Sequence, residues 1–178
     1  MKNISKFSFF LFFFALVGCG GTSNVSSPVK EIPKAVVTET EQYTLTEEYR
    51  KSETTFRTIF TCTYKPKVEQ KKYRTVIMSH GYRSSFDGLR LDANALAKQN
   101  YVVIGFDFCG GGPFSKSDLK FDDMTLDTEQ EDLNDILNYA LSLSFVDQDN
   151  IFLYGASQGG LISTLVGAQH QDKVKGLC

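Results

Sequence analysis

A serine held between two glycines, where a strand-like segment meets a helix-like one, restricts the fold of this chain more than any other feature. Residues 155–159 read Gly-Ala-Ser-Gln-Gly. Side chains at Gly155 and Gly159 would clash as the helix packs back on the strand, so both positions need glycine. The pattern predicts a sharp strand–turn–helix junction that presents Ser157 at its apex.

The rest of the sequence alternates strand-like and helix-like segments. Residues 75–79 and 101–106 are continuous, mainly apolar runs, which is typical of strands buried on both faces. Thr128 and Glu131 have the spacing of a capping box and predict a helix that starts at residue 129. The expected strands are 42–50, 54–64, 75–79, 101–106, 150–154 and 174–178, and the expected helices are 87–99, 129–143 and 160–169. This alternation predicts an α/β fold with a doubly wound, mostly parallel sheet.

The first 18 residues have the plan of a secretory signal. Lys2 and Lys6 form a basic start, an apolar run follows, and a site of small residues ends the segment. This end, Leu16-Val17-Gly18-Cys19, resembles the lipobox of bacterial lipoproteins, in which the signal is cut before the cysteine and the cysteine carries the lipid. The alternatives are an ordinary signal peptide or a single membrane-spanning anchor, although spanning needs about 20 apolar residues.

The resemblance implies an exported lipoprotein, anchored in the membrane through Cys19 and facing the periplasm or the cell surface. Residues 1–18 are then the signal peptide and residues 19–41 a flexible tether, rich in Ser, Gly and Pro near its start. Residues 42–178 form the folded domain in this interpretation.

Charge and cysteine content narrow the possible partners. The net charge is −2, and removal of residues 1–18 takes away two lysines and no acids, which gives −4. This mildly acidic net charge does not favour binding to nucleic acid. Because the two histidines are far apart and no Cys-x-x-Cys occurs, we expect neither a metal nor a cofactor. Cys62, Cys109 and Cys178 follow Cys19, and this odd number leaves at least one thiol unpaired, with the pairing open.

Ser157 is the candidate nucleophile. A serine hydroxyl needs a base that accepts its proton and donors that stabilise the oxyanion formed after attack. The N–H of Gln158, at the positive end of the following helix, is one expected donor. The other is the N–H of Tyr82 in the loop that contains His80, where Gly81 lets the backbone approach the substrate. The alternative is a tight turn with an incidental serine.

No base for this serine can be assigned from the sequence. His170 lies 13 residues after Ser157, on or beyond the same helix. A rise of about 1.5 Å per residue separates the two by about 20 Å, which is far beyond hydrogen-bond reach. His80 is interpreted as a structural histidine bonded within its own loop. Asp107 precedes a glycine-rich turn and is interpreted as a residue that stabilises this turn, not as the acid of a triad.

Three motifs together resemble the α/β-hydrolase superfamily. They are His80-Gly81-Tyr82, Gly105-Phe106-Asp107-Phe108-x-Gly110 and Gly155-Ala156-Ser157-Gln158-Gly159-Gly160. The most similar branch contains cinnamoyl (feruloyl) esterases, monoacylglycerol-lipase-like enzymes and serine aminopeptidase-like hydrolases. The resemblance covers residues 44–178 and implies that Ser157 is the nucleophile and that Tyr82 and Gln158 supply the oxyanion amides.

Members of this superfamily place the catalytic Asp after a later strand and the His after the last one. Both positions would lie beyond Cys178, and residues 174–178 resemble the first half of the next core strand. We therefore expect the N-terminal part of an α/β-hydrolase sheet, truncated at its C-terminus and nearly inactive by itself.

The leading hypothesis is a serine hydrolase that cleaves small-molecule carboxylic esters through an acyl-enzyme on Ser157. A serine peptidase or aminopeptidase of the same fold is the alternative within enzymes, because the acyl pocket and the lid decide the substrate. A non-catalytic surface lipoprotein, which uses a hydrolase-like core to bind a ligand or a partner, is the alternative from another class.

Overall fold

The two apolar runs in the middle of the sequence form neighbouring strands in the middle of the sheet. The computed structural model describes residues 31–178, and the folded unit spans Ile32–Cys178. Strands β4 (Tyr73–Ser79) and β5 (Val102–Phe106) pair in parallel, and all but one of their side chains are buried. Burial on both faces explains why these strands are apolar throughout instead of alternating with polar residues.

The sheet has an antiparallel half and a parallel half. Its seven strands follow the order β1-β2-β3-β5-β4-β6-β7. The remaining strands are β1 (Val36–Glu39), β2 (Tyr43–Lys51), β3 (Thr58–Pro66), β6 (Val146–Gly155) and β7 (Val174–Leu177). The pairs β1–β2, β2–β3 and β3–β5 are antiparallel. Strands β5, β4, β6 and β7 run parallel to one another. The carboxyl ends of these four strands therefore point to one edge of the sheet.

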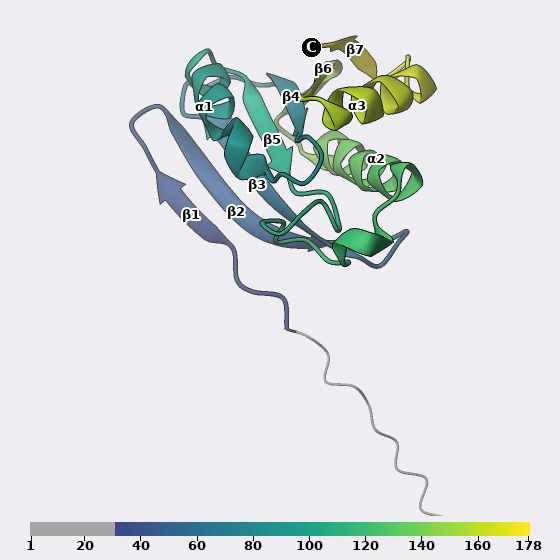
Figure 1. Cartoon of the computed structure of the whole chain (residues 1–178). Helices are drawn as coiled ribbons and strands as arrows, with labels where there is room; N and C mark the ends of the chain where they lie inside the picture. Colours follow the sequence, from purple (N-terminus) through teal and green to yellow (C-terminus); the bar gives the residue numbers. More distant parts are fainter. Residues whose placement is uncertain (1–30) are drawn as a thin grey trace, which may run out of the picture. The chain divides into compact units, whose positions relative to one another are not determined.

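Helices cover both faces of the sheet (Figure 1). They are η1 (Phe86–Leu89), α1 (Arg90–Lys98), η2 (Phe121–Asp123), α2 (Leu126–Ser142) and α3 (Gln158–Gln169). Phe86 and Ala93 belong to a core on the α1 face, and Leu137 and Ile162 belong to a larger core under α2 and α3. One sheet with an apolar core and helices on each face confirms the predicted α/β class.

The folded unit begins before the boundary expected at residue 42. Residues Val36–Glu39, which fall in the expected tether 19–41, form β1 and pair with β2. All four β1 side chains are exposed. The segment also lacks the alternation of apolar and polar residues by which a half-buried strand is predicted. The expected signal peptide 1–18 and the lipidation site Cys19 lie outside the described residues.

Helix α2 begins three residues earlier than the sequence predicted. Its capping box joins Thr125 and Thr128: the Thr125 hydroxyl accepts from the Thr128 N–H at 3.1 Å, and the Thr128 hydroxyl accepts from the Thr125 N–H at 2.9 Å. The predicted box of Thr128 and Glu131 is therefore wrong. Glu131 instead pairs with Arg57 at 2.9 Å.

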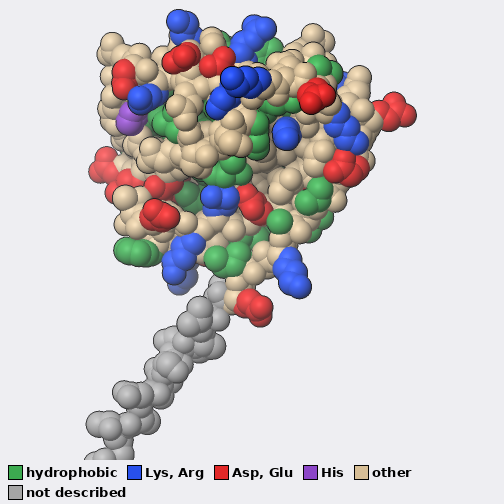
Figure 2. Space-filling view, turned by 180° about the vertical axis from the view of Figure 1, so that it is seen from behind, with side chains coloured by type: hydrophobic (Ala, Val, Ile, Leu, Met, Phe, Trp, Pro, Cys, Tyr) green, Lys and Arg blue, Asp and Glu red, His purple; other side chains and the backbone are tan. Residues whose placement is uncertain are grey.

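The described surface mixes both signs of charge, as the face in Figure 2 shows. No helix within residues 31–178 is long and apolar enough to cross a membrane. Across the same residues, no cluster of three or more His, Cys, Asp or Glu could hold a metal ion. The three cysteines found there are free thiols: Cys62 and Cys109 are buried, and Cys178 is exposed.

A buried ion pair ties the loop between β2 and β3 to α2. Asp132 Oδ1 accepts from Nε and Nη2 of Arg57 at 3.2 and 2.9 Å, and Oδ2 accepts from the Cys109 N–H at 2.7 Å. Asp132 is fully buried, and burial raises its pKa to about 6 although these donors oppose the shift. One carboxyl group thus joins three segments that are distant in the sequence.

The raised pKa of Asp132 predicts a pH-dependent stability. A carboxyl group whose pKa is higher in the folded than in the unfolded state supports folding fully below about pH 4, and this contribution is lost as the pH rises through about 6. Asp132→Asn should remove this component, so that the wild type loses about 2–3 kcal/mol more unfolding free energy than the variant between pH 4 and 7.

Urea unfolding at a series of pH values measures the difference. Asp149→Asn, at an exposed position, is the matched control and should keep the wild-type slope. Parallel curves for wild type and Asp132→Asn would contradict the prediction.

Candidate active site

Ser157 lies at the apex of a sharp turn between β6, which ends at Gly155, and α3, which begins at Gln158. Its backbone angles are φ 53° and ψ −118°, in a region that residues other than glycine rarely adopt. Such a strained conformation persists only where the surrounding structure enforces it. The residue is exposed, so the hydroxyl is within reach of a ligand.

Backbone contacts on both sides of the serine enforce this conformation. A Cβ atom at Gly155 would lie 2.4 Å from the carbonyl oxygen of Gly159. A Cβ atom at Gly159 would lie 2.3 Å from the carbonyl oxygen of Ser79, at the end of β4. Neither distance is possible for a carbon atom, so α3 can pack this closely on the strand ends only with glycine at both positions.

The loop after β4 lies against the serine. The register of β4 and β6 places Ser79 opposite Gly155, so the two strands end together. The N–H of Ala156 donates to the carbonyl oxygen of Ser79 at 3.0 Å. A Cβ atom at Gly81 would lie only 3.3 Å from Cβ of Ser157. The structure therefore brings the loop of His80, Gly81 and Tyr82 together with the serine.

Several backbone N–H groups at the serine turn and in the loop after β4 have no acceptor among residues 31–178, namely those of Gly81, Tyr82, Ser157 and Gln158. Tyr82 and Gln158 are the two positions that the sequence predicted as oxyanion donors. Gln158 is the first residue of α3, where N–H groups lack partners within the helix and the helix dipole is positive. Tyr82 is 55% exposed. Both N–H groups can therefore donate to an oxygen atom of a ligand.

His80 is buried, and both of its ring nitrogens have partners. Nε2 accepts from the Phe108 N–H at 3.0 Å, which places the proton on Nδ1, from where it is donated to the Gly81 carbonyl oxygen at 2.8 Å. Burial lowers the pKa of this imidazole and favours its neutral form. These contacts agree with the structural interpretation of His80, because the ring links the loops after β4 and β5.

Asp107 organises the loop after β5. Its Oδ1 accepts from the Phe86 N–H at 2.7 Å, and its Oδ2 accepts from the Lys116 N–H at 2.8 Å. The residue is 1% exposed, and burial raises the pKa of its carboxyl group. Both oxygens bind backbone N–H groups, so Asp107 holds the loops after β4 and β5 in place. This agrees with its interpretation as a residue that stabilises a turn.

His170 lies at the opposite end of α3 from Ser157. It is the C-cap residue, and its Nε2 lies 2.7 Å from Oδ1 of Asn134 on α2. The 12 residues of α3 span about 18 Å. The chain has two histidines, and neither makes a hydrogen bond to Ser157 within the described structure.

Sequence reasoning missed two neighbours of the site. Glu129 on α2 is 2% exposed and accepts a hydrogen bond from Nε2 of Gln158 at 2.5 Å. Phe121 in η2 contacts Tyr82 with 5.3 Å between the ring centroids, and the guanidinium carbon of Arg83 lies 5.2 Å from the Phe121 ring. The first contact depends on how α2 crosses α3 and the second on a long loop, so no sequence motif indicates either.

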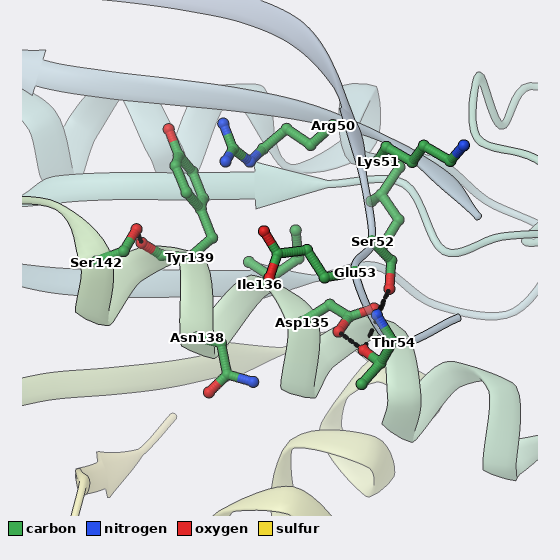
Figure 3. A pocket seen from close by; sticks show the side chains of 11 residues that line it. Arg50, Lys51, Ser52, Glu53, Thr54, Asp135, Ile136, Asn138, Tyr139 and Ser142 are labelled. Carbon is green, nitrogen blue, oxygen red and sulfur yellow. Dashed lines mark hydrogen bonds between the residues drawn. The ribbon is translucent and has the colours of Figure 1, made fainter. Parts of the chain in front are cut away.

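A separate cavity of about 290 Å³ lies between the loop after β2 and α2 (Figure 3). On one wall Arg50 covers the ring of Tyr139 at 3.5 Å, and on another the Thr54 hydroxyl donates to Asp135 Oδ1 at 2.6 Å. No residue of the predicted site lines this cavity. The cavity is therefore not part of the predicted site.

The strained serine turn and a mixed sheet of this strand order are features of an α/β hydrolase. The chain belongs to the serine aminopeptidase, S33, family, whose model matches residues 70–178, more than half of its length. The matched region runs from β4 to β7 and contains Tyr82, Ser157 and Gln158. This match confirms the predicted superfamily.

Solved structures of other proteins share the fold. Est1E from Butyrivibrio proteoclasticus, in a structure with ferulic acid bound, is 28% identical with a TM-score of 0.64, and the match covers 72% of this chain and 50% of that chain. Acetyl xylan esterase 1 from a Thermoanaerobacterium species is 21% identical with a TM-score of 0.68, covering 83% and 50%. DcsB, in complex with its substrate analogue, is 25% identical with a TM-score of 0.63, covering 75% and 45%.

The chain thus spans about half the length of these structures. No curated protein matches it.

The contact between Gly159 and Ser79 predicts a position that tolerates no side chain. Gly159→Ala would place Cβ 2.3 Å from a backbone oxygen that cannot rotate away. We expect a loss of at least about 3 kcal/mol in the free energy of unfolding, or no folded protein. Gly88→Ala is the control, because its Cβ would meet only the Ser84 hydroxyl oxygen at 3.6 Å. Urea unfolding measures both, and equal midpoints would refute the proposed steric constraint.

Proposed function

We propose that the full-length protein is a serine hydrolase that cleaves small-molecule carboxylic esters through an acyl-enzyme on Ser157. One observation carries the proposal: an exposed serine lies in a strained turn against the loop after β4, and the N–H groups of Tyr82 and Gln158 have no acceptor within residues 31–178. Acyl transfer needs a nucleophile and hydrogen-bond donors for the oxyanion, and these residues can supply both.

In the proposed reaction, Ser157 Oγ attacks the ester carbonyl carbon while a general base takes its proton. The carbonyl oxygen becomes an oxyanion, which the N–H groups of Tyr82 and Gln158 stabilise. Collapse of this intermediate breaks the bond to the alcohol, which leaves with a proton from the base. Water then attacks the acyl-enzyme and releases the acid, which restores the serine.

The proposed base and its acid partner are a histidine and an aspartate that follow residue 178 in the full-length protein. In α/β hydrolases the triad occurs in the order Ser, Asp or Glu, His. The contacts of His80, His170 and Asp107 with other groups support this assignment. Residues 1–178 alone should accordingly be nearly inactive.

Ester hydrolysis is favoured over peptide hydrolysis by the likeness to Est1E, which is 28% identical and was solved with ferulic acid bound. The description of the matching family as serine aminopeptidases favours the second candidate, a peptidase that uses the same serine. Both candidates share every step up to the acyl-enzyme, and they differ in the group that leaves.

Ser157→Ala in the full-length protein should lower kcat on short-chain p-nitrophenyl esters by at least about 10³-fold, because no other group can form the acyl-enzyme. Ser163→Ala is the control: it removes from the same helix a buried hydroxyl that has no partner in the described part of the chain, and it should leave kcat unchanged. Release of p-nitrophenol measures the rates.

An unchanged rate in Ser157→Ala would refute the nucleophile assignment. Aminoacyl p-nitroanilides, assayed in parallel, separate the two candidates. Faster turnover of anilides than of esters would favour the peptidase.

We further propose that the mature protein is attached to the membrane through a lipid on Cys19. The lipobox-like residues Leu16 to Cys19 after a basic and apolar start support this proposal. Cys19→Ser should move the protein from the detergent-extracted membrane fraction to the aqueous fraction, as followed by immunoblotting. Cys178→Ser removes an exposed thiol and should not change the distribution. A Cys19→Ser protein that stays in the membrane fraction would count against lipidation.

A further inference from the structure

A buried carboxylate lies behind the residue that follows the candidate nucleophile. Glu129 is 2% exposed, and its Oε2 accepts from Nε2 of Gln158 at 2.5 Å. No lysine, arginine or histidine of residues 31–178 forms an ion pair with it. Asp132, a second acid on the same helix, raises the pKa of Glu129 by charge repulsion.

This carboxylate is unfavourable for folding. Burial raises the pKa of Glu129, Asp132 raises it further, and the hydrogen bond from Gln158 lowers it. A glutamine at position 129 would accept the same hydrogen bond without burying a charge. Stability alone therefore gives no reason for an acid here, whereas a charged acceptor holds its donor more tightly than a neutral one.

Glu129 lies in the first turns of α2, which hydrogen bonds hold in place. The reciprocal bonds of Thr125 and Thr128 cap the first turn of α2. One turn further along, Asp132 is held by Arg57 and by the Cys109 N–H. The start of α2 is thus bound to two other segments, and Glu129 offers Gln158 an acceptor at a fixed place.

The anchored residue, Gln158, also carries one of the two backbone N–H groups proposed as oxyanion donors. The peptide between Ser157 and Gln158 lies in the strained turn, and its N–H is the proposed oxyanion donor. With α3 packed on the strand ends and the Gln158 side chain bound to α2, this peptide can no longer rotate freely. Oxyanion stabilisation requires such a donor to stay within about 0.5 Å of its productive position.

We infer that Glu129 is a positioning residue, which holds the Gln158 side chain and thereby aims the Gln158 N–H at the oxyanion. The inference rests on the proposed function, and it names a residue on α2 that acts on the reaction without touching the substrate.

Steady-state kinetics of the full-length protein on a p-nitrophenyl ester test the inference. Glu129→Ala should lower kcat about tenfold with KM within about twofold, because the donor acts mainly in the transition state and is displaced, not removed. Glu129→Gln should recover kcat to within about threefold of wild type. In urea unfolding, Glu129→Gln should be at least as stable as wild type.

A double-mutant cycle checks that the effect passes through Gln158. Gln158→Ala should lower kcat by the same factor as Glu129→Ala, and the double variant should lose no more than either. Gln130→Ala is the matched control. It removes the hydrogen bond from Gln169 to Gln130, 3.0 Å long, which joins the same two helices at the far end of α3, and it should leave kcat unchanged.

Three kinetic results would overturn the inference: wild-type kcat in Glu129→Ala, a rise in KM alone, or an equal loss of kcat in Gln130→Ala. A readout without turnover is the ¹⁵N relaxation of the Gln158 amide. Exchange broadening in Glu129→Ala that is absent from wild type supports the anchoring, and unchanged relaxation refutes it. If Ser157→Ala still cleaves esters, the proposed function fails while the relaxation data alone decide the role of Glu129.

Discussion

The close packing of Gly159 on the end of β4 is the contact on which the rest of the site depends. Because α3 sits where no side chain fits, the chain must reverse direction within three residues after β6, and Ser157 takes up a left-handed backbone. The same reversal exposes the serine and leaves the first N–H of α3 without an acceptor among residues 31–178. The shared end point of β4 and β6 then places the loop of Gly81 and Tyr82 beside it.

Buried acids hold the segments around this turn. Asp107 and Asp132 accept hydrogen bonds from backbone N–H groups and thereby fasten the loops after β4 and β5. Burial raises the pKa of both carboxyl groups, so each lowers stability when ionised. Glu129 differs because its partner is the side chain of Gln158, the residue next to the nucleophile. Charge is thus buried in this fold where loops or site residues must be kept in position.

Elements with strong local signals were predictable, and elements without them were not. The buried strands β4 and β5 were evident as apolar runs, and the serine turn from its glycines. Strand β1 was missed because its exposed residues acquire a partner only when β2 forms. The start of α2 was misplaced because Thr125 and Thr128 cap each other, while Glu131 is drawn to Arg57 from another segment. Competition between local and distant partners cannot be read from spacing alone.

The sequence by itself determined the turn at Ser157 and the distance that separates His170 from it, because steric limits and helix rise act over a few residues. Tertiary structure decided which side chains surround that turn. It bound both nitrogens of His80, directed Asp107 to backbone groups and brought Glu129 against Gln158. These contacts depend on how separate helices and loops pack across the sheet. They produce no periodic pattern of residues in the sequence.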